Sequence, residues 1–199
     1  MPVKLRLSLI TAIWATTVVA GFALLINHEE QPAAQAAAPL VWPSASTLPR
    51  SQKKSTLIMF AHPFCPCTRA SINELSKLVS RCQGKLNVEV VFLRPPGVTV
   101  DWEKSPSWQL ARAIPGVTVR HDDQGGESNV FGARTSGEVV LYNPEGELIF
   151  HGGITGGRGH EGDNVGLDAV QSLLLHNHAN VSGTPTFGCS LSNSVQHLN

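Results

Sequence analysis

The sequence predicts an α/β domain of three layers, in which helices cover both faces of a mixed central sheet, with a transmembrane helix before it. Two observations predict the sheet. A short apolar run over residues 56–61 breaks at His62-Pro63, and an amphipathic helix follows, as expected for a buried strand with its crossover connection. Residues 138–142 and 147–151 are two further strands, and the turn at residues 143–146 joins them into a hairpin.

The remaining elements complete the order strand, helix, strand, helix, strand, strand, helix. A second strand is expected over residues 86–93, and helices are expected over residues 102–114 and 165–176. Asp163 and Asn164 are expected to cap the last helix. Residues 131–137 are expected to form a loop that leads into the hairpin.

The most informative stretch is Cys65-Pro66-Cys67, at the junction of the first strand and its helix. Ser71 to Glu74 has the spacing of a capping box, so the helix is expected to begin within a few residues of the thiols. Thiols at a helix N-terminus meet unpaired N–H groups and the positive end of the helix dipole, which favour the thiolate. Residues two apart on a helix point about 200° apart. Cys65 must therefore precede the helix, where Pro66 pushes it towards an extended conformation.

The cysteine pair suits more than one chemistry. A disulfide across a single residue closes a small ring and should be strained and easily reduced, which suits dithiol–disulfide exchange. In that reaction Cys65 is expected to be the more exposed, attacking thiol and Cys67 its partner. Two thiolates also suit a soft metal, so a Cu- or Zn-binding or metallochaperone domain is the alternative, with His160 or Cys189 as added ligands. A binding module without turnover is a third interpretation.

Several other residues are candidates for an accessory role at the thiols. The last helix should end near residue 177, at the opposite end of the sheet, and about 12 further residues reach about 40 Å, enough to return Cys189 to the thiols. The glycine-rich loop after the hairpin should emerge at the cysteine end, which brings Arg158 and His160 near. His62 precedes a proline next to the thiols and could raise their thiolate fraction or bind a metal.

The N-terminal region predicts the compartment. Lys4 and Arg6 precede an uncharged stretch over residues 7–26, which matches the ~20 residues that span a bilayer and exceeds the ~7–15 of a signal-peptide core. Positive charge before this stretch and acidic residues after it place the domain outside the cytoplasm. We therefore expect a single-pass, uncleaved anchor in the inner membrane and a periplasmic domain, although residues 34–36 have the small-x-small pattern of a cleavage site.

The chain then divides into four segments. Residues 1–30 are the anchor and residues 31–54, rich in Ala and Pro, are expected to be an extended linker. Residues 55–178 form the domain, and residues 179–199 form a tail that carries Cys189.

The composition of the chain excludes some classes of protein and of partner. The charge balance of 15 basic and 15 acidic residues argues against nucleic acid as a partner, because such a surface needs a basic excess. Four cysteines in 199 residues exclude a small disulfide-stapled protein. Cys82 falls on the apolar side of the first domain helix and is expected to be a core thiol. No organic cofactor is expected.

A family resemblance rests on the motifs. The strand, CxC and helix, the turn at residues 143–146 and the final helix resemble the thioredoxin superfamily, particularly its membrane-tethered extracytoplasmic members. The motifs CPCTRAS, TSG, RGHEGDN and TPTFGC, which begin at residues 65, 135, 158 and 184, are similar to those of the bacterial RedB proteins.

The resemblance implies a thioredoxin-like fold and thiol chemistry, with protein thiols or disulfides of the periplasm as partners. The chain departs from the superfamily in having CxC in place of CxxC. It also has Thr135-Ser136-Gly137 where thioredoxins carry a cis-proline beside the thiols, so Thr135 and Ser136 are candidate accessory residues.

Overall fold

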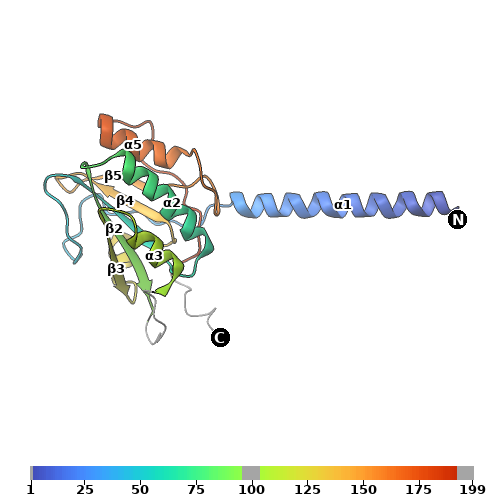
Figure 1. Cartoon of the computed structure of the whole chain (residues 1–199), viewed down its shortest axis with the longest axis horizontal. Coiled ribbons are helices and arrows are strands. Elements are labelled where there is room, and N and C mark those ends of the chain that lie inside the picture. The colour runs from blue at the N-terminus through green and yellow to red at the C-terminus, as the bar shows by residue number, and fades with distance from the viewer. Residues whose placement is uncertain (1, 96–103, 192–199) are drawn as a thin grey trace. The chain divides into compact units, whose positions relative to one another are not determined.

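A computed structural model describes residues 2–95 and 104–191 of the chain (Figure 1). It divides into a unit of residues 1–31 and a unit of residues 32–199. The first unit contains helix α1 (Val3–Glu30), whose 28 residues include none that is buried. This helix is long and apolar enough to cross a membrane, as predicted.

The second unit is built on one five-stranded sheet in the order β3-β2-β1-β4-β5 (Figure 1). The strands are β1 (Ser55–Ala61), β2 (Leu86–Arg94), β3 (Val117–Asp123), β4 (Glu138–Tyr142) and β5 (Leu148–Gly153). Central β1 pairs parallel with β2 and antiparallel with β4, β2 pairs parallel with β3, and β4 and β5 form the antiparallel hairpin. The predicted mixed sheet and thioredoxin-like fold are confirmed by this arrangement.

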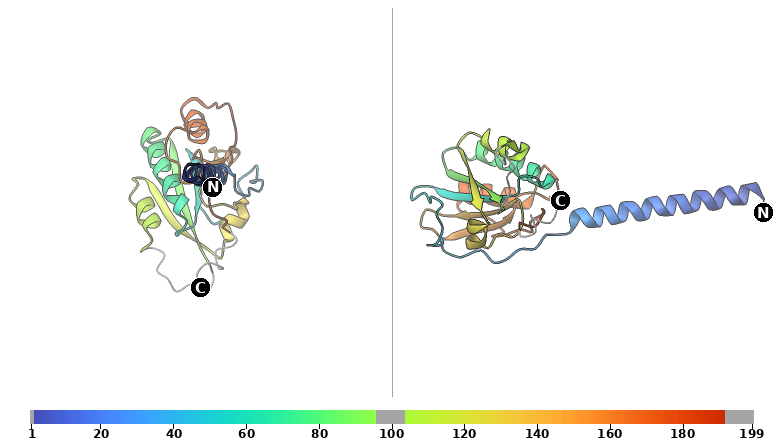
Figure 2. Two further views of the ribbon diagram at one scale, coloured as in Figure 1. Left: turned by 90° about the vertical axis from the view of Figure 1, so that its right-hand side faces the viewer. Right: turned by 90° about the horizontal axis from the view of Figure 1, so that it is seen from below.

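One face of the sheet is covered by helices α2 (Pro66–Arg81), α3 (Pro106–Arg112) and α5 (Val165–His176) (Figure 1 and Figure 2). Successive strand residues point to opposite faces. Leu57 and Met59 therefore join the core under these helices, while Ile58 and Phe60 join the core of the other face. Cys82 is 2% exposed in the first of these cores, as predicted.

The opposite face is covered by the short helix α4 (Gly126–Phe131) and by the segment of residues 38–48. Ala38 and Leu48 are buried there, and the ring of Trp42 lies 5.2 Å from that of Phe131. The expectation of an extended linker is therefore wrong for this segment. Its apolar side chains complete a core that α4 is too short to cover.

Strand β3 and helix α4 were not predicted. β3 is an edge strand whose alternate side chains are exposed and whose end, residues 120–123, is charged, so it lacks the apolar run of a central strand. α4 has only six residues, too few to show a helical period. Of the helix expected over 102–114, the residues before 104 lie outside the described ones, and α3 occupies Pro106–Arg112.

The start of α2 also differs from the prediction. The helix begins at Pro66, so the proposed capping box lies inside it, where Ser71 is 1% and Glu74 0% exposed. Proline suits the first helical position because its missing N–H has no partner to lose there. At α5 the prediction holds, since Asn164 is the N-cap and its Oδ1 accepts a hydrogen bond from Leu167 N at 2.8 Å.

Candidate active site

Cys65 lies at the point where β1 has ended and α2 begins. It is the N-cap residue of α2, with extended backbone angles of φ −78° and ψ 120°, and Pro66 follows at the first helical position. This geometry confirms that Cys65 precedes the helix while Cys67 lies in its first turn. Cys65 N donates to His62 O at 3.2 Å, which closes the turn between strand and helix. Cys65 thus lies at the N-terminal end of α2.

Three thiols meet at this position. The Sγ atoms of Cys65 and Cys189 lie 2.7 Å apart, although 124 positions separate the two residues in sequence. The thiol of Cys67 is also within hydrogen-bonding contact of Cys65. The prediction that the tail returns to the thiol end of the sheet is therefore confirmed by this contact.

Hydrogen bonds make the three thiols electrostatically unequal. Hydrogen bonds from the thiols of Cys189 and Cys67 lower the pKa of Cys65 well below its ordinary range, and the Thr68 hydroxyl contributes in the same direction. The pKa values of Cys67 and Cys189 are raised, first because each thiol donates to Cys65 and then by burial. These hydrogen bonds favour the thiolate at Cys65 and the protonated form at the other two cysteines.

The exposure of the thiols differs from the prediction. Cys65 is 3% exposed, whereas Cys67 and Cys189 are half-buried. The expectation that Cys65 is the more exposed thiol of the pair is wrong, because the returning tail places Cys189 against it. The residue with the most reactive protonation state is thus the least accessible of the three.

The tail lies beside the loop before β4 and pairs with it through one isolated antiparallel bridge. Ser136 N donates to Cys189 O at 2.8 Å, and Leu191 N donates to Arg134 O at 2.8 Å. Thr135 and Ser190 form an antiparallel bridge between these two bonds. The loop of residues 134–136 therefore positions Cys189 through its main chain.

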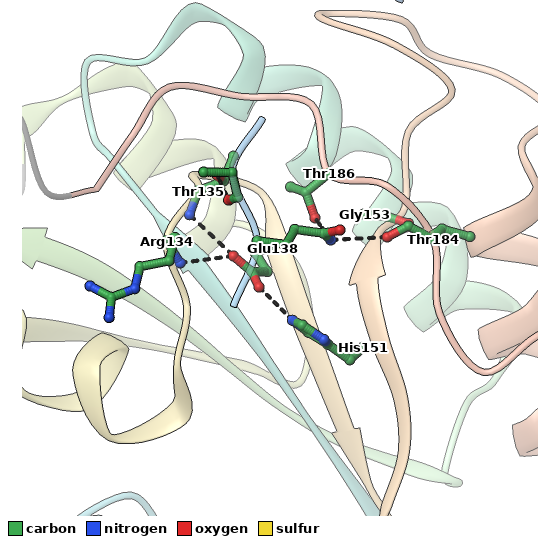
Figure 3. A network of polar contacts seen from close by, with 9 residues as sticks. Arg134, Thr135, Glu138, His151, Gly153, Thr184 and Thr186 are labelled. Carbon is green, nitrogen blue, oxygen red and sulfur yellow. Dashed lines mark hydrogen bonds and ion pairs between the residues drawn. The ribbon is translucent and has the colours of Figure 1, made fainter. Parts of the chain in front are cut away.

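A buried carboxylate holds this loop in place (Figure 3). Glu138 is 0% exposed, and its Oε2 accepts hydrogen bonds from Arg134 N at 2.9 Å and from Thr135 N at 3.1 Å. Its Oε1 lies 2.5 Å from His151 Nε2 on the neighbouring strand. Sequence reasoning missed this pair, although a glutamate opening the apolar strand EVVLY was a visible signal.

The candidate residues Thr135 and Ser136 connect the loop to its surroundings. The Ser136 hydroxyl lies 2.6 Å from Thr68 Oγ1 and accepts a hydrogen bond from His62 N at 2.8 Å. The Thr135 hydroxyl donates to Ala34 O at 2.7 Å. Ser136 thus joins the loop to the start of α2, and both residues have positioning roles.

The two candidate histidines differ in their contacts. His62 Nδ1 accepts a hydrogen bond from Phe64 N at 3.2 Å, and burial lowers the pKa of His62, so the ring is neutral at pH 7. The His160 side chain is exposed and has no hydrogen bond or ion pair with any residue in the described ranges. The loop prediction holds instead for Arg158, whose side chain lies against Cys67 and whose Nη1 donates to Gly188 O at 2.7 Å.

The thiol cluster does not have the arrangement of a metal site in the described part of the chain. Within residues 2–95 and 104–191, no group of three or more His, Cys, Asp or Glu side chains is arranged to hold a metal ion. Of the four expected metal ligands, the sulfur atoms of Cys65, Cys67 and Cys189 lie together. The imidazole of His160 is not part of this group.

Comparisons with known proteins show similarity in fold. No protein-family model matches the sequence, and no match was found among curated proteins. A hypothetical protein from Sinorhizobium meliloti superposes with a TM-score of 0.61 at 17% identity, over 79% of this chain and 96% of that one. An uncharacterised conserved protein from Geobacillus kaustophilus gives 0.57 at 14% identity, over 81% and 92%. At these identities the likeness shows the fold alone.

A third structure is more distant. The exposed lipoprotein thioredoxin Etrx1 of Streptococcus pneumoniae has a TM-score of 0.45 at 17% identity, over 69% of this chain and 98% of that one.

Proposed function

We propose that the chain is a membrane-anchored thiol–disulfide oxidoreductase, RedB-like in its motifs, with its domain in the periplasm. The observation that carries the proposal is the asymmetric thiol cluster, in which Cys65 accepts hydrogen bonds from two other thiols at a helix start. A thiolate is the nucleophile of disulfide exchange, and this arrangement maintains one at neutral pH. The partners are proteins that carry accessible disulfides or thiols, and no organic cofactor is required.

The reaction follows from the protonation states. Cys65 Sγ attacks one sulfur of a partner disulfide, the partner S–S bond breaks, and its other sulfur leaves as a thiolate. Cys67, two residues away, then attacks Cys65 Sγ, releases the second partner thiolate and closes the Cys65–Cys67 disulfide. The proton of Cys67 passes to the released thiolate. The partner gains two electrons and the chain loses two.

The location is proposed from the N-terminal unit. Lys4 and Arg6 precede the apolar helix α1, and Glu29 and Glu30 end it. Basic residues stay on the cytoplasmic side of a membrane helix, so residues 32–199 are placed in the periplasm. A reporter fused after Asn199 should be active only on that side.

Mixed-disulfide trapping tests the oxidoreductase proposal. The double variant Cys67→Ser/Cys189→Ser keeps Cys65 as the attacking thiol and removes both neighbours that can resolve an intermediate. It should accumulate mixed disulfides with a disulfide-bonded model peptide, seen as a mass increase that reductant reverses. Adding Cys65→Ser should abolish the adduct. If the double variant forms no adduct, or if wild type takes up stoichiometric Cu or Zn through Cys65 and cannot be oxidised, the proposal fails.

A further inference from the structure

The docked tail, defined as residues 188–191, occupies the thiol site as a segment of the same chain that pairs with a loop. Its main chain pairs with residues 134–136, and Leu191 is 6% exposed in the core of the second sheet face. Extended segments commonly bind to exposed backbone in this way, with hydrogen bonds for affinity and side chains for specificity. The docked tail therefore has the form of a bound peptide whose cysteine lies on Cys65.

The fit around Gly188 shows that this position is specific. A Cβ atom at Gly188 would lie 2.0 Å from Ser136 O and 3.1 Å from Thr135 Cγ2. Only a residue without a side chain can lie so close to that backbone. On its other side, the Gly188 carbonyl accepts the hydrogen bond from Arg158. The docked tail is held between a loop and a cation immediately before Cys189.

The docked tail also determines access to the nucleophile. Cys65 is 3% exposed while Cys189 lies against it, so a partner sulfur can approach Cys65 only after Cys189 has moved. Apart from the bond from Arg158 to Gly188 O, the hydrogen bonds that hold the docked tail are main-chain bonds to residues 134–136. Another extended polypeptide offers the same donors and acceptors, so it can take the place of the docked tail.

We propose that the docked tail is a built-in disulfide ligand, which leaves when a partner polypeptide binds residues 134–136 and then returns to store the oxidising equivalent as a Cys65–Cys189 disulfide. This inference rests on the proposed oxidoreductase function. It assigns Cys189 as a third redox-active thiol and gives the substrate class as extended, cysteine-containing segments of proteins.

The chemistry is an internal exchange that balances without a further oxidant. After the partner is reduced, Cys189 Sγ attacks Cys65 Sγ in the Cys65–Cys67 disulfide. The bond between Cys65 and Cys67 breaks, Cys67 leaves as a thiolate and takes up the proton of Cys189, and the Cys65–Cys189 bond forms. No electrons are gained or lost overall. Ring strain favours the exchange towards the Cys65–Cys189 disulfide. The Cys65–Cys67 disulfide closes a small ring, whereas the Cys65–Cys189 disulfide closes no local ring.

Peptide mapping distinguishes the two disulfides directly. Trypsin cuts after Lys54, Arg69 and Arg158, so Cys65 and Cys67 share peptide 55–69 while Cys189 lies in peptide 159–199. The full chain in detergent is oxidised with glutathione disulfide, blocked with N-ethylmaleimide and digested. We expect the two peptides to be linked, with about tenfold less of peptide 55–69 bridged internally. Cys67→Ser should keep the link and Cys189→Ser should remove it. A product that is mainly internally bridged would overturn the inference.

A second variant tests docking with every thiol present. Gly188→Ala should displace the docked tail, reduce the linked peptide about tenfold and speed the alkylation of reduced Cys65 about tenfold, because the site is then open most of the time. Gly156→Ala is the matched control, since its Cβ would meet only Asn164 Cβ at an ordinary 3.8 Å. Equal alkylation rates in the two variants would overturn the inference.

The two proposals can fail separately. Trapping by the double variant together with an internally bridged wild-type peptide would retain the oxidoreductase and reject the docked tail as a disulfide ligand. If wild type gives the linked peptide but the double variant traps no adduct, the oxidoreductase proposal is rejected. The Cys65–Cys189 disulfide is then a structural one.

Discussion

The two segments that flank the sheet in sequence both lie on the domain, but different interactions hold them. Residues 38–48 bury Ala38 and Leu48 and pack Trp42 against the rings of Phe131 and Tyr142. The docked tail relies on main-chain hydrogen bonds, on the Arg158 bond to Gly188 O and on one thiol contact, and Leu191 is its only buried large apolar side chain within the described residues.

The difference bears on which segment can move. Burying apolar side chains contributes about 1.5–3 kcal/mol for each large residue, and leaving the core exposes both the segment and the face beneath it. A main-chain hydrogen bond contributes only about 1 kcal/mol net and can be replaced by one to another chain. Residues 38–48 are therefore a fixed part of the core, whereas the docked tail is exchangeable.

The largest expected effect tests the fixed segment. Leu48→Ala should lower the free energy of unfolding by about 3 kcal/mol, because it removes a side chain that is 7% exposed from a packed core. Urea denaturation of the full chain in detergent measures this value. Leu40→Ala, at a side chain that is 78% exposed, should change it by less than about 0.5 kcal/mol. Equal losses in the two variants would show that the segment is not part of the core.

An intermediate effect is expected at the docked tail. Cys189→Ala removes the first of the hydrogen bonds that stabilise the Cys65 thiolate, and such a bond to a charged group contributes about 1.5–3 kcal/mol. The pKa of Cys65 should therefore rise by at least about one unit. The ultraviolet absorbance of the thiolate, titrated with Cys65→Ser subtracted, measures it. An unchanged midpoint would mean that Cys189 does not donate to Cys65.

The same hydrogen bonds predict how stability depends on pH. The folded-state pKa of Cys65 is lowered, so its thiolate stabilises the fold fully above the unfolded-state pKa, and this contribution is lost as the pH falls through the folded-state value. Cys189→Ala weakens this contribution. The stabilities of wild type and variant should therefore converge as the solution is acidified, which denaturation at a series of pH values would show.

The smallest effect is expected where the two flanks meet. Gln35 Nε2 donates to Thr184 O at 3.0 Å and to Thr186 Oγ1 at 2.7 Å. These bonds link the residues just before segment 38–48 to the residues just before the docked tail. Gln35→Ala should speed the alkylation of Cys65 about threefold, as expected when two partly exposed hydrogen bonds that together contribute about 0.6 kcal/mol are lost. Gln83→Ala, at another exposed glutamine, is the control. Equal alkylation rates of Cys65 in the two variants would show that the hydrogen bonds of Gln35 do not affect access to the thiols.

Local sequence determined a large part of this protein. The apolar runs and helical period predicted four of the five strands and the helices α2 and α5, because each depends on side chains within a few residues. The proline of CPC placed Cys65 before α2 by its own backbone restriction, and the position of Cys82 on the apolar helix face predicted its burial. These features need no knowledge of distant parts of the chain.

Only the tertiary structure decided which thiol is shielded and what shields it. The pairing of residues 189–191 with residues 134–136 uses main-chain groups, which every residue carries, so no side-chain pattern indicates it. Chain length could show that Cys189 is able to reach the thiols, but the 2.7 Å contact and the burial of Cys65 depend on the close fit of Gly188 against Ser136 and on the buried Glu138 that holds the loop. The placement of Cys65 before α2 is therefore local in origin, whereas its accessibility and much of its thiolate character depend on a segment more than a hundred residues away.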